Sequence, residues 1–273
     1  TAHFLKHLNF MNKFNLTPTL RYAWRTRRVW WFSSLARTKA RFARTTIGGF
    51  WLGLSNLLSI AALASIYGVV LKVDNFNSYI IYLGCGLVCW NSISTSFSSA
   101  PNLFISNSNQ VLNTNTNYIF YTLEEWAFNL QDFAQSLILV LFGLSFVQNN
   151  LFFNLFTSGL LPLFNLLMFL YWFPVFISIA GIRYKDLYQL IPVVIQLVFL
   201  LSPFLYEKET LGSLAWTADL NPLYQMVAPL RDALIHGNTS MSKFILLLIF
   251  NFVGTFISLI MLNRMKKTLP YLL

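Results

Sequence analysis

The stretch IGGFWLGLSNLLSIAALASIYGVVL, residues 47–71, runs for 25 residues without a charged side chain. A helix of about 20 apolar residues crosses the hydrocarbon core of a bilayer, so this run is long enough to span a membrane. Gly49 and Gly53 stand four residues apart within it. That spacing allows a second helix to approach closely. The stretch therefore predicts a transmembrane helix with a close neighbour.

The rest of the chain has the same character. Of its 273 residues, 56% are hydrophobic and only 10% are charged, whereas a soluble domain carries about 25% charged residues. Pro162 and Pro174 predict kinks in the longest apolar run. We therefore expect an all-α polytopic membrane protein with six transmembrane helices. After residues 47–71, the expected spans are residues 79–101, 119–147, 151–182, 187–206 and 244–262.

The N-terminal region is basic and amphipathic. Thr17-Pro18 predicts a helix start, because proline fits the first turn of a helix. The segment up to residue 46 is rich in Arg and Trp, which favours a helix at the lipid interface with snorkelling side chains; a dedicated lipid-headgroup site is the alternative. Its arginines repeat at helical spacing as two triplets: Arg21, Arg25 and Arg28, then Arg37, Arg41 and Arg44.

The basic residues also predict the orientation. Ten of the 19 Lys and Arg residues precede residue 45, which indicates a membrane surface as partner and not nucleic acid. With six spans, one side holds these ten together with Arg183, Lys185, Arg264, Lys266 and Lys267. The other side holds Lys72, Lys208, Arg231 and Lys243. Fifteen against four predicts that both termini are cytoplasmic.

Residues 221–237, NPLYQMVAPLRDALIHG, are too polar for a seventh span. Arg231 and Asp232 would each cost about 2.5–3.5 kcal/mol at the centre of a bilayer. An apolar stripe at helical spacing, with Arg231 and Asp232 off it, nevertheless predicts a short amphipathic helix that Pro229 breaks or kinks and Gly237 ends. We expect it to dip into the outer leaflet or to pack over the bundle. The stripe consists of Leu223, Val227, Leu230 and Leu234.

Residues for catalysis or metal binding are missing from the sequence. No glycine is followed by lysine, so the GK[ST] element of a nucleotide-binding loop is absent. The three histidines are scattered, and His236 fits a helix C-terminus. Cys85 and Cys89 share a helical face without His or acidic neighbours, which favours a structural role over metal or disulfide chemistry. We therefore predict a chain that is not an enzyme and holds no metal.

Three acidic residues fall within the third expected span. Glu124 and Glu125 lie near its cytoplasmic end, where they face solvent or pair with N-terminal arginines. Asp132 follows about 12 Å deeper at 1.5 Å per residue, and no other expected span carries a basic partner for it. A buried acid in a membrane is a functional candidate by default, for example as the proton relay of an ion-coupled carrier.

The order of several motifs resembles the membrane subunit of ABC-2-type exporters of lipid-linked polysaccharides, which are the O-antigen, capsule and teichoic acid permeases. The resemblance covers about residues 37–237, and the O-antigen branch is most similar. The motifs are Arg41-Phe42-Ala43-Arg44-Thr45 with Gly48 and Trp51, then Gly181-Ile182-Arg183-Tyr184-Lys185-Asp186-Leu187, Gln196, Ser202-Pro203, Asn221-Pro222 and Arg231.

The resemblance implies a homodimer of six-span subunits that binds two separate ATPase subunits, which hold ATP and Mg²⁺. It implies one ABC-2 domain over residues 1–273, in the inner membrane of a bacterium. The parts are the cytoplasmic N-terminus (1–46), five spans (47–206) with a coupling loop (102–118), external gate helices (207–243) and the last span with the C-terminus (244–273). Ser106 and Asn113 replace an acid and a lysine that relatives tend to have, so an ordinary polar loop is the alternative for residues 102–118.

The resemblance also implies roles for individual residues. The expected ATPase contacts are Ser106, Asn107, Asn109, Gln110 and Asn113, and the expected cytoplasmic interface residues are Arg41, Arg44, Arg183, Lys185 and Asp186. The expected external gate consists of Asn221, Pro222, Tyr224, Arg231 and Asp232. Aromatic rings stack on the apolar faces of sugars. Candidates for the substrate path, with the lipid belt or the core as the alternative, are Tyr67, Tyr79, Tyr82, Trp90, Trp172 and Tyr224.

These observations together predict the permease subunit of an ATP-driven exporter of lipid-linked polysaccharide, most similar to O-antigen exporters. Three alternatives stay open. The first is an ABC-2 exporter of another substrate, such as a lipid or a drug. The second is an ion-coupled secondary carrier that uses Asp132, and the third is a membrane-embedded glycosyltransferase, which the lack of an acidic cluster disfavours.

Overall fold

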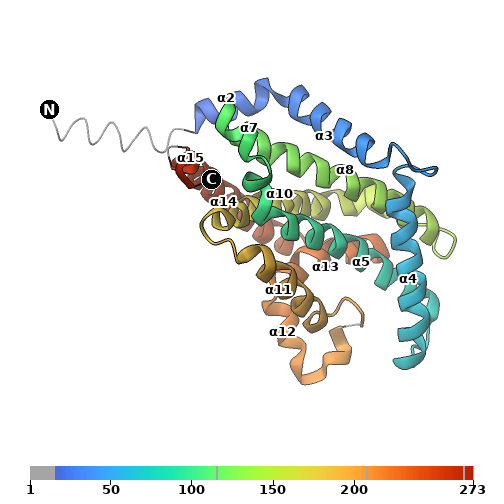
Figure 1. The fold of residues 1–273 in the computed structure, drawn as a ribbon. Helices are drawn as coiled ribbons and strands as arrows, with labels where there is room; N and C mark the ends of the chain where they lie inside the picture. The colour runs from blue at the N-terminus through green and yellow to red at the C-terminus, as the bar shows by residue number, and fades with distance from the viewer. Residues whose placement is uncertain (1–15, 115, 207, 267, 273) are drawn as a thin grey trace.

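The computed structural model describes residues 16–114, 116–206, 208–266 and 268–272, and all regular elements in these ranges are helices. Residues 1–15 with Lys6 and Lys13, Asn115 of the expected coupling loop, Glu207 and Lys267 lie outside the described residues. Figure 1 shows a bundle of long helices, with shorter helices at its edges. The prediction of an all-α polytopic membrane protein is confirmed.

Five helical segments are long and apolar enough to cross a membrane. Their starts agree with the sequence prediction to within three residues, and their ends differ by up to five. The segments are α4 (Phe50–Val70), α5 (Phe76–Ser99) with its continuation through η1 (Ala100–Asn102) and α6 (Leu103–Ser106), α8 (Ile119–Leu144), the run Leu151–Arg183, and α14 (Met241–Met265). The run Leu151–Arg183 comprises α9 (Leu151–Asn154), the π-helical turn η2 (Leu155–Gly159) and α10 (Leu160–Arg183).

The sixth expected span is shorter than predicted. Helix α11 (Leu187–Leu201) has 15 residues, about 22 Å at 1.5 Å per residue, and does not by itself cross a core of about 30 Å. Helices α10 and α14 run parallel, because Asn165 bonds to the carbonyl of Phe244 and, seven residues further along both helices, Trp172 donates to Asn251. The chain between them therefore returns along the bundle. The count of six crossings stays a prediction that depends on α11 and the extended segment after it.

The N-terminal helices α2 (Thr17–Arg25) and α3 (Arg27–Phe42) confirm the predicted helix start at Thr17. Helix α3 packs lengthwise on the first half of α8, so it does not lie free on the bundle. Glu124, Glu125 and Asp132 all have partners on α3, including the basic partner that the sequence did not reveal for Asp132. The contacts are Ser33–Glu124 (2.7 Å), Arg37–Glu125 (2.7 Å) and Arg41–Asp132 (2.5 Å).

The described N- and C-terminal segments meet at one end of the bundle. The Nζ of Lys266 donates to the hydroxyl of Thr19 at 2.8 Å, and that hydroxyl lies 3.3 Å from Oδ1 of Asn263. Partial burial disfavours the charged amine and lowers the pKa of Lys266. Figure 1 shows α2 and α15 (Leu269–Leu272) at this end.

The prolines in the longest segment do not interrupt its course. Pro162 cannot donate a hydrogen bond to the carbonyl of Ser158, and the hydroxyl of Thr239 donates to that carbonyl at 2.7 Å instead. The π-helical turn lies directly before Pro162, as expected where the regular hydrogen-bond ladder is disturbed. Helix α10 continues through Pro174 as one element.

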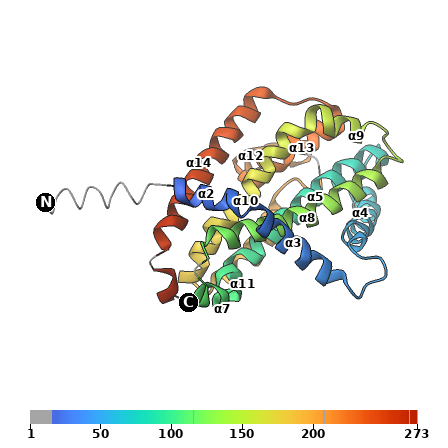
Figure 2. The same ribbon diagram turned by 90° about the horizontal axis from the view of Figure 1, so that it is seen from above.

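Helix α5 forms the centre of the bundle, since 72% of its most apolar 18-residue stretch is buried. The buried share of the corresponding stretch is 17% in α4 and 28% in α14. Figure 2 shows α4 and α14 at opposite edges of the molecule. Gly49 and Gly53 confirm the predicted close approach, because both face α8 without room for a Cβ atom. Cys85 and Cys89 are buried, free thiols on α5.

Candidate functional site

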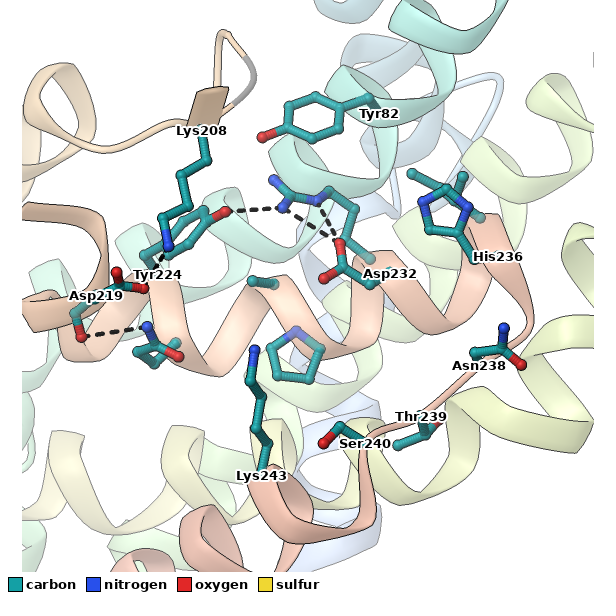
Figure 3. A pocket seen from close by; sticks show the side chains of 15 residues that line it. Tyr82, Lys208, Asp219, Tyr224, Asp232, His236, Asn238, Thr239, Ser240 and Lys243 are labelled. Carbon is teal, nitrogen blue, oxygen red and sulfur yellow. Dashed lines mark hydrogen bonds and ion pairs between the residues drawn. The ribbon is translucent and has the colours of Figure 1, made fainter. Parts of the chain in front are cut away.

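A cavity of about 870 Å³ opens beside α13 (Pro222–His236), the helix formed by the polar stretch that is too charged for a span. Figure 3 shows that its wall combines tyrosines with charged and amide side chains. The lining residues come from α5, α12 (Ala215–Leu220), α13, α14 and the segments between them. They are Tyr82, Lys208, Asp219, Tyr224, Gln225, Ala228, Pro229, Arg231, Asp232, Ile235, His236, Asn238, Thr239, Ser240 and Lys243.

The sequence fixes both ends of α13. Asn221 adopts an extended backbone, and its side-chain oxygen accepts from the N–H groups of Leu223 (3.0 Å) and Tyr224 (3.4 Å), while Pro222 occupies the first turn. Gly237 ends the helix with a φ of 69°, a left-handed conformation that glycine adopts without strain. The predicted ends of the helix are confirmed.

Two details of α13 differ from the sequence prediction. The helix runs through Pro229 without a break. Its other residues are held by packing, since the whole predicted stripe from Leu223 to Leu234 is buried. Arg231 was expected off that stripe, but it is only 3% exposed. The predicted break at Pro229 was therefore wrong. Arg231 is buried although it lies off the stripe, because α13 is inserted into the bundle and contacts α5, α9 and α10.

Arg231 is held mainly by neutral groups. Its Nη2 donates to the hydroxyl of Tyr224 at 3.0 Å, and its Nη1 donates to the carbonyl of Pro203 at 3.4 Å. The guanidinium carbon lies 3.9 Å from the centre of the Tyr82 ring, which is a cation–π contact. Asp232 accepts at 3.3 Å, but its carboxylate is 54% exposed. The guanidinium therefore lines the cavity while these partners compensate for its burial.

The segment after α11 carries the carbonyl groups that face Arg231. The tyrosine hydroxyls of α5 bond to this non-helical backbone, Tyr79 to the carbonyl of Leu205 at 2.6 Å and Tyr82 to that of Pro203 at 2.9 Å. Irregular backbone at membrane depth needs such internal partners. The side-chain amide of Asn221 also donates to the hydroxyl of Ser202, so the start of α13 and the end of α11 are tied together.

The rim of the cavity is charged. Lys208 pairs with Asp219 at 2.6 Å. His236, on the side away from this pair, and Lys243 are both exposed. Aromatic faces beside hydrogen-bond donors and acceptors suit a ligand that has both apolar faces and hydroxyl groups.

Comparison with known proteins identifies the family of this chain. Residues 23–235 match the ABC-2 type transporter family. The chain belongs to this family. The O-antigen export system permease protein RfbA of Klebsiella pneumoniae is 22% identical to it over 246 residues, which cover 84% of this chain and 88% of that protein. Family membership confirms the resemblance drawn from the motifs and makes this ABC-2 chain a multi-pass membrane protein and a transport subunit.

The predicted site residues of the ABC-2 chain lie in three regions, which are the cavity beside α13, the predicted coupling loop and the predicted cytoplasmic interface. All five predicted gate residues belong to α13 or its N-cap, and three of them line the cavity. Among the aromatic candidates, Tyr82 and Tyr224 line the cavity, and Tyr79 bonds to the carbonyl of Leu205 in the segment after α11. Trp90 packs between Phe199 and Phe204, Trp172 donates to Asn251 at 3.0 Å, and Tyr67 packs on the core.

The predicted coupling loop of this ABC-2 chain contains two short helices, α6 and α7 (Ser108–Asn113). Ser106, Asn109, Gln110 and Asn113 are exposed, whereas Asn107 is half-buried and its amide donates to the carbonyl of Leu103 at 2.8 Å. Ile105 and Leu112 are also exposed, at 37% and 50%. The loop therefore presents apolar and amide groups without any charge.

The predicted cytoplasmic interface residues occupy two places. Arg183, Lys185 and Asp186 are exposed in the turn between α10 and α11, and Gly181 packs this end of α10 directly on the backbone of Pro101. Arg44 is exposed after the end of α3, and Arg41 pairs with Asp132 halfway along α8.

Sequence reasoning missed Lys243 as a lining residue of the cavity and the carbonyl of Pro203 as a partner of Arg231. No local signal marks these groups, because only the folding of α14 and of the segment after α11 brings them to α13.

Proposed function

We propose that this chain is the permease subunit of an ATP-driven exporter of lipid-linked polysaccharide, with O-antigen as the first candidate, in the inner membrane of a bacterium. The observation that carries the proposal is the likeness to an O-antigen export permease over 84% of the chain. The cavity beside α13 supports it, because tyrosine rings and polar groups together suit a sugar chain.

The energy comes from separate subunits. The sequence has no nucleotide-binding loop, so ATP and Mg²⁺ bind to two ATPase partners of a homodimeric permease. The partners dock on α6 and α7, where Ile105 and Leu112 offer exposed apolar contacts. Gly181 joins this region to α10 through its contact with Pro101, and α10 reaches α13 at the other end of the bundle. This connection provides a mechanical path from the ATPase to the cavity.

The cavity lies on the outer side in this proposal, and both termini are cytoplasmic. The excess of basic residues on the side of the termini supports this orientation, as does the contact between Thr19 and Lys266 that joins the two ends. Helix α13 then acts as an external gate. When ATP binding moves α10, Arg231 is drawn from the carbonyl of Pro203, and the polar wall becomes accessible to the glycan.

The proposal is tested by co-expression of the chain with an ATPase encoded beside it. We expect a complex with two copies of each subunit, whose ATP hydrolysis rises in the presence of a lipid-linked polysaccharide. A chain that purifies without any ATPase and moves its substrate along a proton gradient would contradict the proposal. The matched control is the Leu112→Glu variant, which should fold but lose the ATPase.

A further inference from the structure

A second cavity lies on the side of the bundle that α3 and α4 cover, and it belongs neither to α13 nor to the coupling helices. It measures about 270 Å³ and lies between α4, α5 and α8. Eight of its 13 lining residues carry a hydroxyl or amide side chain. Among them are Ser55, Asn56, Asn91, Ser92 and Ser136, with Asp132 beside them. Such a lining is unusual inside apolar helices, where polar groups mark functional sites by default.

Two polar atoms of this cavity lack a partner. Oδ2 of Asp132 pairs with Arg41, but Oδ1 is buried without a hydrogen bond, and so is Oγ of Ser92, among the described residues. Buried polar atoms nearly always have partners, and exceptions call for an explanation such as a bound molecule. Both atoms belong to residues that line the cavity. Water or another small hydroxyl-bearing molecule is the usual partner of such atoms in protein interiors.

The chemistry of a guest molecule follows from these groups. An ionised carboxylate only accepts hydrogen bonds, so the guest must present O–H or N–H donors to Asp132. Arg41 already compensates the charge of Asp132 at 2.5 Å, which removes the attraction for a cation. The described residues contain no cluster of metal-ligating side chains. A neutral molecule rich in hydroxyl groups fits this lining, and Asn and Ser side chains can both donate to its oxygens and accept from its hydroxyls.

We infer that this cavity is a binding site for a single sugar ring, in which Oδ1 of Asp132 accepts hydroxyl protons. Its volume of about 270 Å³ lies just below the range of about 300–1,000 Å³ for small-molecule sites, which admits one ring and not a longer chain. Arg41 holds the carboxylate from α3, so the site is tied to the N-terminal helix. The inference rests on the proposed function, because the exported glycan is the source of the sugar.

Saturation-transfer difference NMR on the permease in lipid nanodiscs tests this site, with D-galactose, D-mannose and L-rhamnose as separate probes. We expect saturation transfer to the ring protons of at least one sugar. The signal should fall at least fivefold in Asp132→Asn and in Ser92→Val. The Ser92→Val variant fills part of the cavity and leaves the Arg41–Asp132 ion pair intact. The control is Glu124→Gln, which alters a carboxylate on the same helix outside the cavity and should keep the signal.

Equal signals in the wild type and in both cavity variants would overturn the site. The absence of a signal for all three sugars would overturn it too, because the cavity would then hold only water. Thermal unfolding of each variant shows whether a lost signal follows from a lost fold. If Asp132→Asn is unfolded, the signal of Ser92→Val decides whether the site exists. The failures are distinguishable. Normal ATP-driven export without sugar binding contradicts the site alone, whereas sugar binding without ATP-driven export contradicts the proposed function.

Discussion

Substitution of Arg231 separates its contribution to stability from its role in transport. Arg231→Ala removes a hydrogen bond to Tyr224, another to Pro203 and a cation–π contact with Tyr82. A hydrogen bond of a charged group contributes about 1.5–3 kcal/mol, and a desolvated cation–π contact about 2 kcal/mol. This loss is partly offset, because the variant no longer bears the cost of burying the guanidinium, which is several kcal/mol.

The groups left behind limit the loss of stability. The carbonyl of Pro203 keeps its bond from the hydroxyl of Tyr82 at 2.9 Å, and Tyr224 lines the open cavity beside α13. Asp232 is 54% exposed and becomes hydrated. The variant therefore leaves no bare buried charge, which would cost about 3–5 kcal/mol. We expect a net loss of about 1–3 kcal/mol, or roughly 2–12 °C in Tm for a chain of this size.

Thermal unfolding of the purified complex and ATP-driven transport measure the two effects. Arg231→Met keeps an apolar side chain of similar volume in the place of a buried charge, an exchange that is often neutral or stabilising. It should therefore keep its Tm within a few degrees of the wild type and still lose export. Lys243→Ala at the exposed rim serves as the control and should change stability by less than about 0.5 kcal/mol. Full export by Arg231→Met, or failure of Arg231→Ala to assemble, would refute this reasoning.

Three further substitutions test other parts of the structure. Gly181→Ala places a Cβ atom 2.5 Å from the carbonyl oxygen of Pro101, so the two segments must separate; we expect a lower Tm and weaker stimulation of the ATPase, and an unchanged Tm would argue against this contact. Asn251→Leu leaves the indole N–H of Trp172 buried without its partner, which should cost about 1–3 kcal/mol; unfolding that matches the wild type would contradict this packing. Leu112→Glu should release the ATPase in co-purification without a change in Tm, whereas an intact complex would place the docking surface elsewhere.

The sequence predicted most of the fold because its strongest signals are local. The uncharged run 47–71 and the end signals Asn221-Pro222 and Gly237 depend on few neighbours, and all of them were correct. The burial of Arg231 could not be read from the sequence, because residues 203–206 return to the same place only after α11. The partner of Asp132 was missed for the same reason, since Arg41 belongs to a helix that was expected at the lipid surface.

The most direct test of the central claim is transport by the purified permease with its ATPase in proteoliposomes. Lipid-linked O-polysaccharide is placed on the side where the ATPase docks, and its appearance on the other side is measured with a glycan-specific lectin. The account predicts translocation that requires ATP, stops with a hydrolysis-deficient ATPase and is lost in Arg231→Met. Translocation without ATP that follows an imposed proton gradient, or ATP hydrolysis that moves no glycan, would contradict it.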